Sequence, residues 1–165
     1  MEPWFGHGDL SLEERLQSVG LIDDGAFLDD LASAADELGV EPVGVAGFCM
    51  GGMYALKAAG TGRFYRAVAF YGMFRVPAHW QGPTTIEPLD QVVRPGACPT
   101  LAIVGSVDQW TPADDVAAAE AAGVTVVTYE GADHGFVHDD SRPAHRPADA
   151  ADAWRRAVSF LTPDR

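Results

Sequence analysis

Basic residues are scarce in this sequence. Its 165 residues include 11 lysines and arginines against 24 aspartates and glutamates, which gives a net charge of −13. Nucleic acids and anionic membrane surfaces are bound through clusters of basic side chains, and a surplus of acids repels them. The composition therefore argues against a nucleic acid or a membrane surface as the partner.

Long apolar runs are also missing. No run approaches the roughly 20 residues that a membrane-spanning helix needs. The first ten residues carry acids instead of the basic and then apolar pattern of a signal peptide. We therefore expect a cytoplasmic protein. The two cysteines, Cys49 and Cys98, could form one disulfide, but a reducing compartment favours two free thiols.

The residues that are present are typical of one folded domain. Apolar residues make up 47% of the chain, which is enough to build a core at this length. No internal repeat or low-complexity tract divides the sequence. We expect a single domain over residues 1–165, with an irregular lead-in over 1–20 in which 12–19 could form a short helix.

Apolar periodicity predicts alternating helices and strands from residue 24 onward. Helices are expected over 24–38, 50–59 and 112–122 and from 147 onward, and strands over 43–46, 66–71, 100–104 and 124–129. Residues 72–96 are rich in proline and glycine and predict a long loop, with a helical turn near 89–93. The alternation predicts an α/β fold, a parallel sheet of about four strands flanked by helices.

For three of these helices the sequence predicts more detail. The first should bury a face that includes Leu28, Ala35 and Leu38. The third should begin with Thr111 as its cap and Pro112 at its first position. The last should bury the face formed by Ala151, Trp154, Val158 and Leu161.

The sequence GFCMGG at residues 47–52 places Cys49 between a predicted strand and a predicted helix. A sharp strand-to-helix turn strains the backbone of its central residue and tolerates only very small side chains two positions away. Gly47 and Gly51 meet that demand. The pattern favours a reactive thiol, although a free cysteine elsewhere is usually a small apolar core residue, which is our expectation for Cys98.

Reactive side chains also follow two later strands. Asp108 comes three residues after Gly105, and His134 follows the fourth predicted strand. Because sites in parallel sheets gather beyond the carboxyl ends of the strands, we expect both to meet Cys49. Thiol, carboxylate and imidazole in that order supply a nucleophile, an orienting acid and a base. Asp133 is a competing acid, but adjacent residues rarely orient one another's rings.

In these motifs the sequence resembles the dienelactone hydrolases, a cysteine-using branch of the α/β-hydrolase superfamily. The matching segments are residues 47–52, residues 105–112 and GADHGF at 131–136, and the likeness extends from about residue 24 to the C-terminus. Tyr71-Gly72 and the tail from Arg142 to Trp154 also look like the family. The resemblance implies an α/β-hydrolase core, of which this chain would hold the C-terminal part.

The resemblance also implies roles. Cys49 would attack an ester or lactone carbonyl, His134 would shuttle the proton, and Asp108 would hold the imidazole. The backbone N–H of Met50 would donate to the oxyanion. A thiolate leaves a tetrahedral intermediate more readily than an alkoxide, so only substrates with good leaving groups, such as enol lactones, go forward. We expect a small-molecule ester or lactone substrate and no cofactor.

The family pattern includes strands ahead of the cysteine turn, which would supply a second oxyanion donor, and we find no counterpart of them here. Residues 1–10 would then be a remnant of the segment that follows those strands, in a natural short form or a fragment. The first strand would carry an unpaired edge that could support a homodimer. Loss of one oxyanion donor costs about a hundredfold or more in rate.

Four residues are candidates for lining a substrate pocket, although an aromatic is more often core and an arginine more often a solvated charge. They are Tyr71, Trp110, Phe136 and Arg142.

Two other kinds of site are less consistent with the sequence. A metal site would use His134, His138, Asp139 and His145, but Gly135 interrupts the helix that would place the first two on one face, so we expect no metal. The glycines around Cys49 lack a G-x-G-x-x-G pattern and a following Lys-Ser/Thr, which argues against phosphate binding.

The leading hypothesis is a hydrolase that cleaves an ester or lactone through a Cys49 acyl-enzyme. One alternative is a catalytically weakened remnant that serves as a binding or oligomerising module. Another is a redox-sensing thiol at Cys49.

Overall fold

A four-stranded parallel sheet is the centre of the fold. The computed structural model describes Ser11, Glu14 and residues 18–163. The strands, in the order β1-β2-β3-β4, are β1 Val45–Phe48, β2 Ala67–Phe70, β3 Thr100–Gly105 and β4 Thr125–Tyr129. The α/β prediction is confirmed. The predicted lead-in over 1–20 and the predicted helix over 12–19 lie largely outside the described residues.

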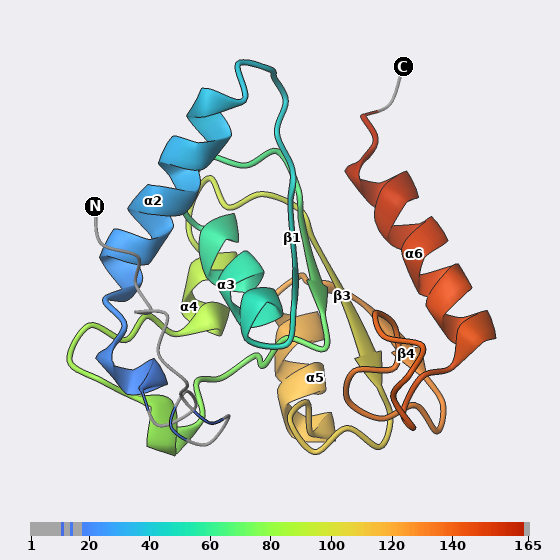
Figure 1. Cartoon of the computed structure of the whole chain (residues 1–165). Helices are drawn as coiled ribbons and strands as arrows, with labels where there is room; N and C mark the ends of the chain where they lie inside the picture. The colour runs from blue at the N-terminus through green and yellow to red at the C-terminus, as the bar shows by residue number, and fades with distance from the viewer. Residues whose placement is uncertain (1–10, 12–13, 15–17, 164–165) are drawn as a thin grey trace.

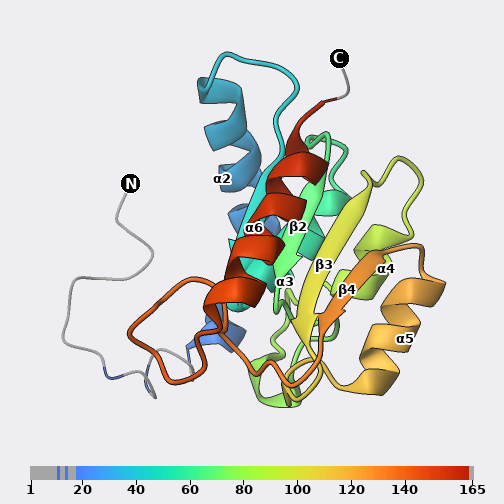
Figure 2. The ribbon, with the colours of Figure 1, turned by 90° about the vertical axis from the view of Figure 1, so that its right-hand side faces the viewer.

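Helices cover the two faces of the sheet unequally. Their bounds are η1 Val19–Leu21, α2 Asp24–Glu37, α3 Met50–Ala59, η2 Ala78–Trp80, α4 Pro88–Val92, α5 Ala113–Ala121 and α6 Pro147–Leu161. Successive right-handed crossovers that advance in one direction put their helices on one face. Accordingly α3, α4 and α5 share a face, with α2 packed outside α3, and α6 covers the other face (Figures 1 and 2).

The two central strands form the core. Every residue of β2 and β3 is buried, as expected for parallel strands covered on both faces. β1 is less protected, and Ala46 is exposed. Among the described residues no strand pairs with the outer side of β1.

The buried face of α6 differs from the prediction. Ala150, Ala153 and Ala157 face the sheet, whereas Trp154 and Val158 are 43% and 57% exposed. Small side chains let the helix lie close to the sheet, while the Trp154 ring, although partly exposed, packs on Phe48 and Phe70. The apolar spacing correctly predicted the helix, but the residues that are fully buried are the alanines.

Two element ends were also predicted wrongly. The first strand begins at Val45, because its pairing with β2 runs from Val45 opposite Ala67 to Phe48 opposite Phe70. In α5 the cap residue is Pro112 and makes no side-chain hydrogen bond. The hydroxyl of Thr111 is buried without a hydrogen-bond partner, so Thr111 is not the cap.

An ionic cluster joins α2 to α3, the helix that follows Cys49. Asp24 accepts hydrogen bonds from Lys57 Nζ at 2.7 Å, from Tyr54 Oη at 2.5 Å and from the backbone N–H of Ile86 at 2.7 Å. Burial lowers the pKa of Lys57, while Asp24 opposes that change. Three donors on one buried carboxylate satisfy its charge.

At the far end of α2, Leu38 is exposed, contrary to prediction.

Candidate active site

One polar or reactive residue follows the carboxyl end of each strand, and these four ends lie together at the lower end of the sheet in Figure 1. Cys49 follows β1, Tyr71 follows β2, Asp108 follows β3, and His134 follows β4. Among the described residues, only Cys49 (φ 55°) and Tyr71 (φ 41°) are non-glycine residues with positive φ. Such strained conformations persist only where the surroundings enforce them, and they cluster at functional sites.

Glycines make room for the cysteine turn, but they are not quite the ones predicted. A Cβ on Gly47 would lie 2.0 Å from the carbonyl oxygen of Gly51, so only glycine fits at 47. A Cβ on Gly51 would meet nothing within 4 Å, so the prediction for that position is wrong. The second required glycine is Gly52, where a Cβ would lie 2.9 Å from Gly72 Cα.

Asp108 and His134 are held together by their side chains and by their loops. His134 Nδ1 lies 2.8 Å from Asp108 Oδ2, and the Asp108 side chain is fully buried. Asp108 Oδ1 accepts the backbone N–H of Trp110 at 2.9 Å. A Cβ on Gly105 would lie 2.2 Å from the carbonyl oxygen of Ala132, so this glycine lets the two loops approach. The carboxylate is thus fixed before any ligand binds.

Asp133 has a different partner. Its Oδ1 accepts the backbone N–H of His134 at 2.7 Å, and its side chain is exposed. It therefore shapes the loop, and the imidazole contacts Asp108 instead.

The thiol and the imidazole shift each other's pKa in opposite directions. Burial raises the pKa of Cys49, but the hydrogen bond and charge of His134, with help from the Met50 N–H, bring it below the ordinary value. Burial would lower the pKa of His134, yet Asp108 and Cys49 together raise it to about 9. Between the lowered thiol pKa and about pH 9, the pair is therefore a thiolate and an imidazolium. A thiolate is the reactive form of cysteine.

Tyr71 and Phe136 lie behind this pair. The Tyr71 ring packs edge-on against the His134 ring at a centroid distance of 5.0 Å, and its hydroxyl contacts Nδ1 of His138. Phe136 is fully buried and packs against Tyr71 at 6.0 Å. Phe136 thus supports the site from the core and does not line an open pocket, contrary to the expectation for it.

A cavity of about 580 Å³ opens beside His134. Its walls include Trp110, Arg142 and Arg146, and Trp110 is backed by Trp80, whose ring stacks on it at 5.8 Å. A Cβ on Gly135 would lie 2.8 Å from Nη1 of Arg142, so the absence of a side chain at this position makes room for the guanidinium. Trp110 and Arg142, two of the four candidate pocket residues, therefore line this cavity.

Metal and membrane features are not found in the described part of the chain. In that part no group of three or more His, Cys, Asp or Glu side chains could hold a metal ion. No helix among the same residues is both long and apolar enough to cross a bilayer.

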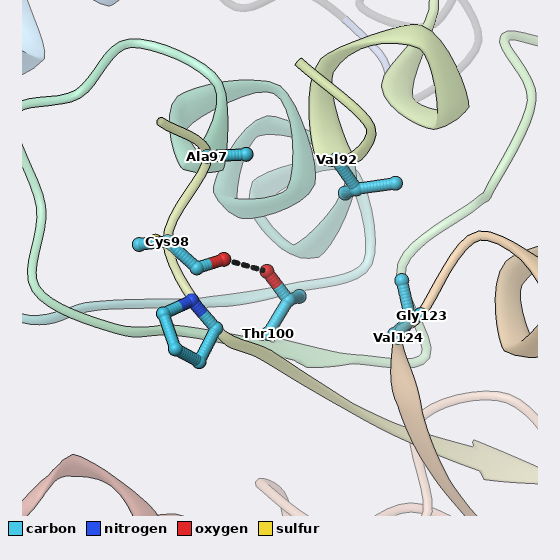
Figure 3. A pocket seen from close by; sticks show the side chains of 7 residues that line it. Val92, Ala97, Cys98, Thr100, Gly123 and Val124 are labelled. Atoms are coloured by element: carbon cyan, nitrogen blue, oxygen red, sulfur yellow. Dashed lines mark hydrogen bonds between the residues drawn. The ribbon is translucent and has the colours of Figure 1, made fainter. Parts of the chain in front are cut away.

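The second cysteine lies at the opposite edge of the sheet. Cys98 precedes β3 and lines a surface pocket of about 310 Å³ with Val92, Thr100 and Val124 (Figure 3). It packs against the core yet remains half-buried, like Cys49, and both thiols are free. Burial raises the pKa of Cys98. The chain thus contains two thiols of similar exposure whose pKa values are shifted in opposite directions.

This contrast predicts selective alkylation. At pH 6, iodoacetamide should modify Cys49 at least about tenfold faster than Cys98, because the pKa of Cys49 is lowered and that of Cys98 is raised, so Cys49 has the larger thiolate fraction. Peptide mass spectrometry over a time course gives both rates from one sample, so Cys98 is an internal control. Equal rates, or faster labelling of Cys98, would contradict the thiolate–imidazolium pair.

Comparisons with known proteins show what this chain is similar to. The sequence model of the Dienelactone hydrolase family matches residues 14–164. A Bradyrhizobium protein named "Probable 2-oxo-3-(5-oxofuran-2-ylidene)propanoate lactonase" is 32% identical over 93% of this chain and 66% of its own length. A Synechocystis protein named "Putative carboxymethylenebutenolidase" is 29% identical over 91% of this chain and 62% of its own length.

Solved structures share the fold. The crystal structure of a Klebsiella pneumoniae protein described as a "Putative Dienelactone Hydrolase" has a TM-score of 0.70 and 29% identity, over 85% of this chain and 62% of that one. A Paleococcus ferrophilus monoacylglycerol lipase has a TM-score of 0.63 at 16% identity, over 86% of this chain and 76% of that one. The chain thus spans about two thirds or less of the length of the two curated relatives and of the Klebsiella protein.

Proposed function

The chain belongs to the dienelactone hydrolase family, and from that premise we propose that it hydrolyses an ester or lactone with Cys49 as nucleophile, His134 as proton carrier and Asp108 as orienting acid. The observation that carries the proposal is the buried Asp108 carboxylate held against His134, with Cys49 at the end of β1 near enough for the thiol and the imidazole to shift each other's pKa. A carboxylate, an imidazole and a nucleophile in sequence are what acyl transfer requires.

The proposed reaction proceeds in two steps. The Cys49 thiolate adds to the substrate carbonyl, and the backbone N–H of Met50, at the start of α3, donates to the oxyanion. The intermediate collapses to a thioester as His134 gives its proton to the leaving oxygen. Water, deprotonated by His134, then attacks the thioester, and the thiolate is regenerated. Asp108 stabilises the imidazolium whenever it forms.

Two features support a narrow substrate class within this proposal. A thiolate is itself a good leaving group, so forward collapse requires a stabilised leaving oxygen, as in an enol lactone or an aryl ester. Arg142 lines the cavity beside His134 in a chain whose net charge is −13, together with Asp133 and with Arg146, whose Nε is paired with Asp149. Guanidinium groups bind carboxylates well. A lactone that carries a carboxylate is therefore the proposed substrate, in keeping with the "propanoate" in the name of one relative.

An acylation experiment tests the proposed function. Mixing the protein with p-nitrophenyl acetate should release a burst of one nitrophenolate per chain if deacylation is slower than acylation. Intact mass spectrometry of the quenched sample should show one added acetyl group, which peptide mapping places on Cys49. A folded protein that neither acquires this group nor turns the ester over would contradict the proposal.

A further inference from the structure

His138 touches the site through one residue. Its Nδ1 contacts the hydroxyl of Tyr71, and its ring lies 5.4 Å from the ring of Phe48. Tyr71 in turn packs against His134, at 5.0 Å between ring centroids. The edge of the His138 side chain is open to solvent, since the residue is exposed overall. A solvent-facing histidine is therefore connected to the proposed base by one buried tyrosine.

The direction of the hydrogen bond follows from the surroundings of Tyr71. The residue is fully buried, and burial, reinforced by the charge of Cys49, raises its pKa well above the usual range. The hydroxyl therefore keeps its proton and is the donor. Nδ1 of His138 must then be the acceptor, which places the proton of the neutral imidazole on Nε2.

Tyr71 needs such a partner for two reasons. Its backbone is in a strained conformation at φ 41°, which requires surrounding contacts to hold it. Its hydroxyl is also close enough to Cys49 for their charges to interact. A free phenol proton near a thiolate would hydrogen-bond to the sulfur and reduce its nucleophilicity.

We propose that His138 is a positioning residue: by accepting the Tyr71 proton it keeps the ring seated on His134 and keeps that proton off the Cys49 thiolate. The role rests on the proposed function of Cys49, but the contact itself can be tested without it. Sequence reasoning considered His138 only as a metal ligand. Its position four residues after His134 suggested that reading. Its role as a hydrogen-bond acceptor could be inferred only once the structure showed the contact with Tyr71.

The arrangement needs a free lone pair on Nδ1 of His138, because only an unprotonated nitrogen can accept the Tyr71 proton. The groups around the imidazole are known. Tyr71 faces it from the end of β2, Phe48 from β1 without charge, and Asp139 is its neighbour in sequence, with a carboxylate that accepts hydrogen bonds from Ser141. Arg142 lies near enough to act on both Asp139 and Tyr71. Cys49 and His134 lie beyond Tyr71.

Three variants test the role. In His138→Ala the acceptor is lost, and kcat for an activated ester should fall about tenfold with KM changed less than twofold, the effect expected for one ordinary hydrogen bond. His138→Asn keeps an acceptor near the position of Nδ1 but cannot titrate, and it should retain at least half of kcat. The double variant Tyr71→Phe/His138→Ala should have the same kcat as Tyr71→Phe alone, because phenylalanine has no hydroxyl for His138 to hold.

Rescue by His138→Asn, with kcat affected and KM nearly unchanged in His138→Ala, is a readout that a purely structural role would not give. An inactive His138→Asn, unchanged kcat in His138→Ala, or additive losses in the double variant would each overturn the proposal while leaving the proposed function intact.

Nitrogen-15 NMR of histidine-labelled protein tests the contact independently of any activity. His138 should show an unprotonated, hydrogen-bonded Nδ1 that shifts in Tyr71→Phe, while His134 keeps its bond to Asp108. If the wild type has no esterase activity at all, this measurement still decides the contact. A His138 with its proton on Nδ1 at neutral pH would overturn it, even if the alanine variant proved too unstable to study.

Discussion

Hydrolysis of an activated aryl ester is expected to fall by at least about a thousandfold when Cys49 is replaced by alanine. The substitution removes the only atom that the mechanism can acylate. It should leave the turn intact, because Cys49 is half-buried and alanine also has a Cβ that can occupy the strained position. Steady-state rates, with circular dichroism to confirm folding, measure the effect.

The chain provides its own control for this experiment. Cys98→Ala removes a thiol of similar exposure at the opposite edge of the sheet, and it should leave the rate within about twofold because nothing in the mechanism involves it. If both variants keep the wild-type rate, Cys49 is not the nucleophile. If the wild type itself is inactive, the alternative of a binding module, for which the open edge of β1 offers a surface, gains support.

The fold could be predicted well because its signals are local. β2 and β3 are continuous apolar runs, and burial on both faces produces that pattern. Element ends were less predictable. The apolar run over 43–48 is uniform, so only pairing with β2 decides that the strand begins at Val45. The face of α6 could not be predicted from spacing alone, because alanine and tryptophan both count as apolar while only alanine allows close approach to the sheet.

The candidate site could be predicted where position along the chain determines it. Cys49, Asp108 and His134 follow the ends of β1, β3 and β4, and a parallel sheet brings such ends together on one side. The structure places Asp108 against His134, as expected. What escaped prediction depends on side-chain direction: Phe136 faces the core, and His138 faces Tyr71. Neither direction is encoded in spacing within an irregular loop.

Separate substitutions of Asp108 and Asp133 distinguish the carboxylate that orients the imidazole from one that only shapes the loop. Asp108→Asn is expected to lower kcat/KM by about a hundredfold to ten-thousandfold, as loss of the acid does in related triads. The Asp108 carboxylate accepts from both Trp110 N–H and His134 Nδ1, whereas an amide has a single acceptor oxygen, so the variant loses the charge and one of these two hydrogen bonds. Asp133→Asn removes a neighbouring exposed charge that contacts only a backbone N–H, and its effect should stay within about threefold.

The loss of kcat/KM in Asp108→Asn should depend on pH, and its direction follows from the coupled pKa values of Cys49 and His134. Asp108 raises the pKa of His134 toward about 9, so its loss lets the imidazolium deprotonate at lower pH. The thiolate then loses its charged partner, and the pKa of Cys49 rises, since His134 lowers it more than the distant charge of Asp108 raises it. Thiolate persists at alkaline pH in both proteins but disappears earlier in the variant as pH falls. The deficit should therefore be larger at pH 6 than at pH 8.5, and a deficit that shrinks on acidification would assign Asp108 a role other than stabilising the imidazolium.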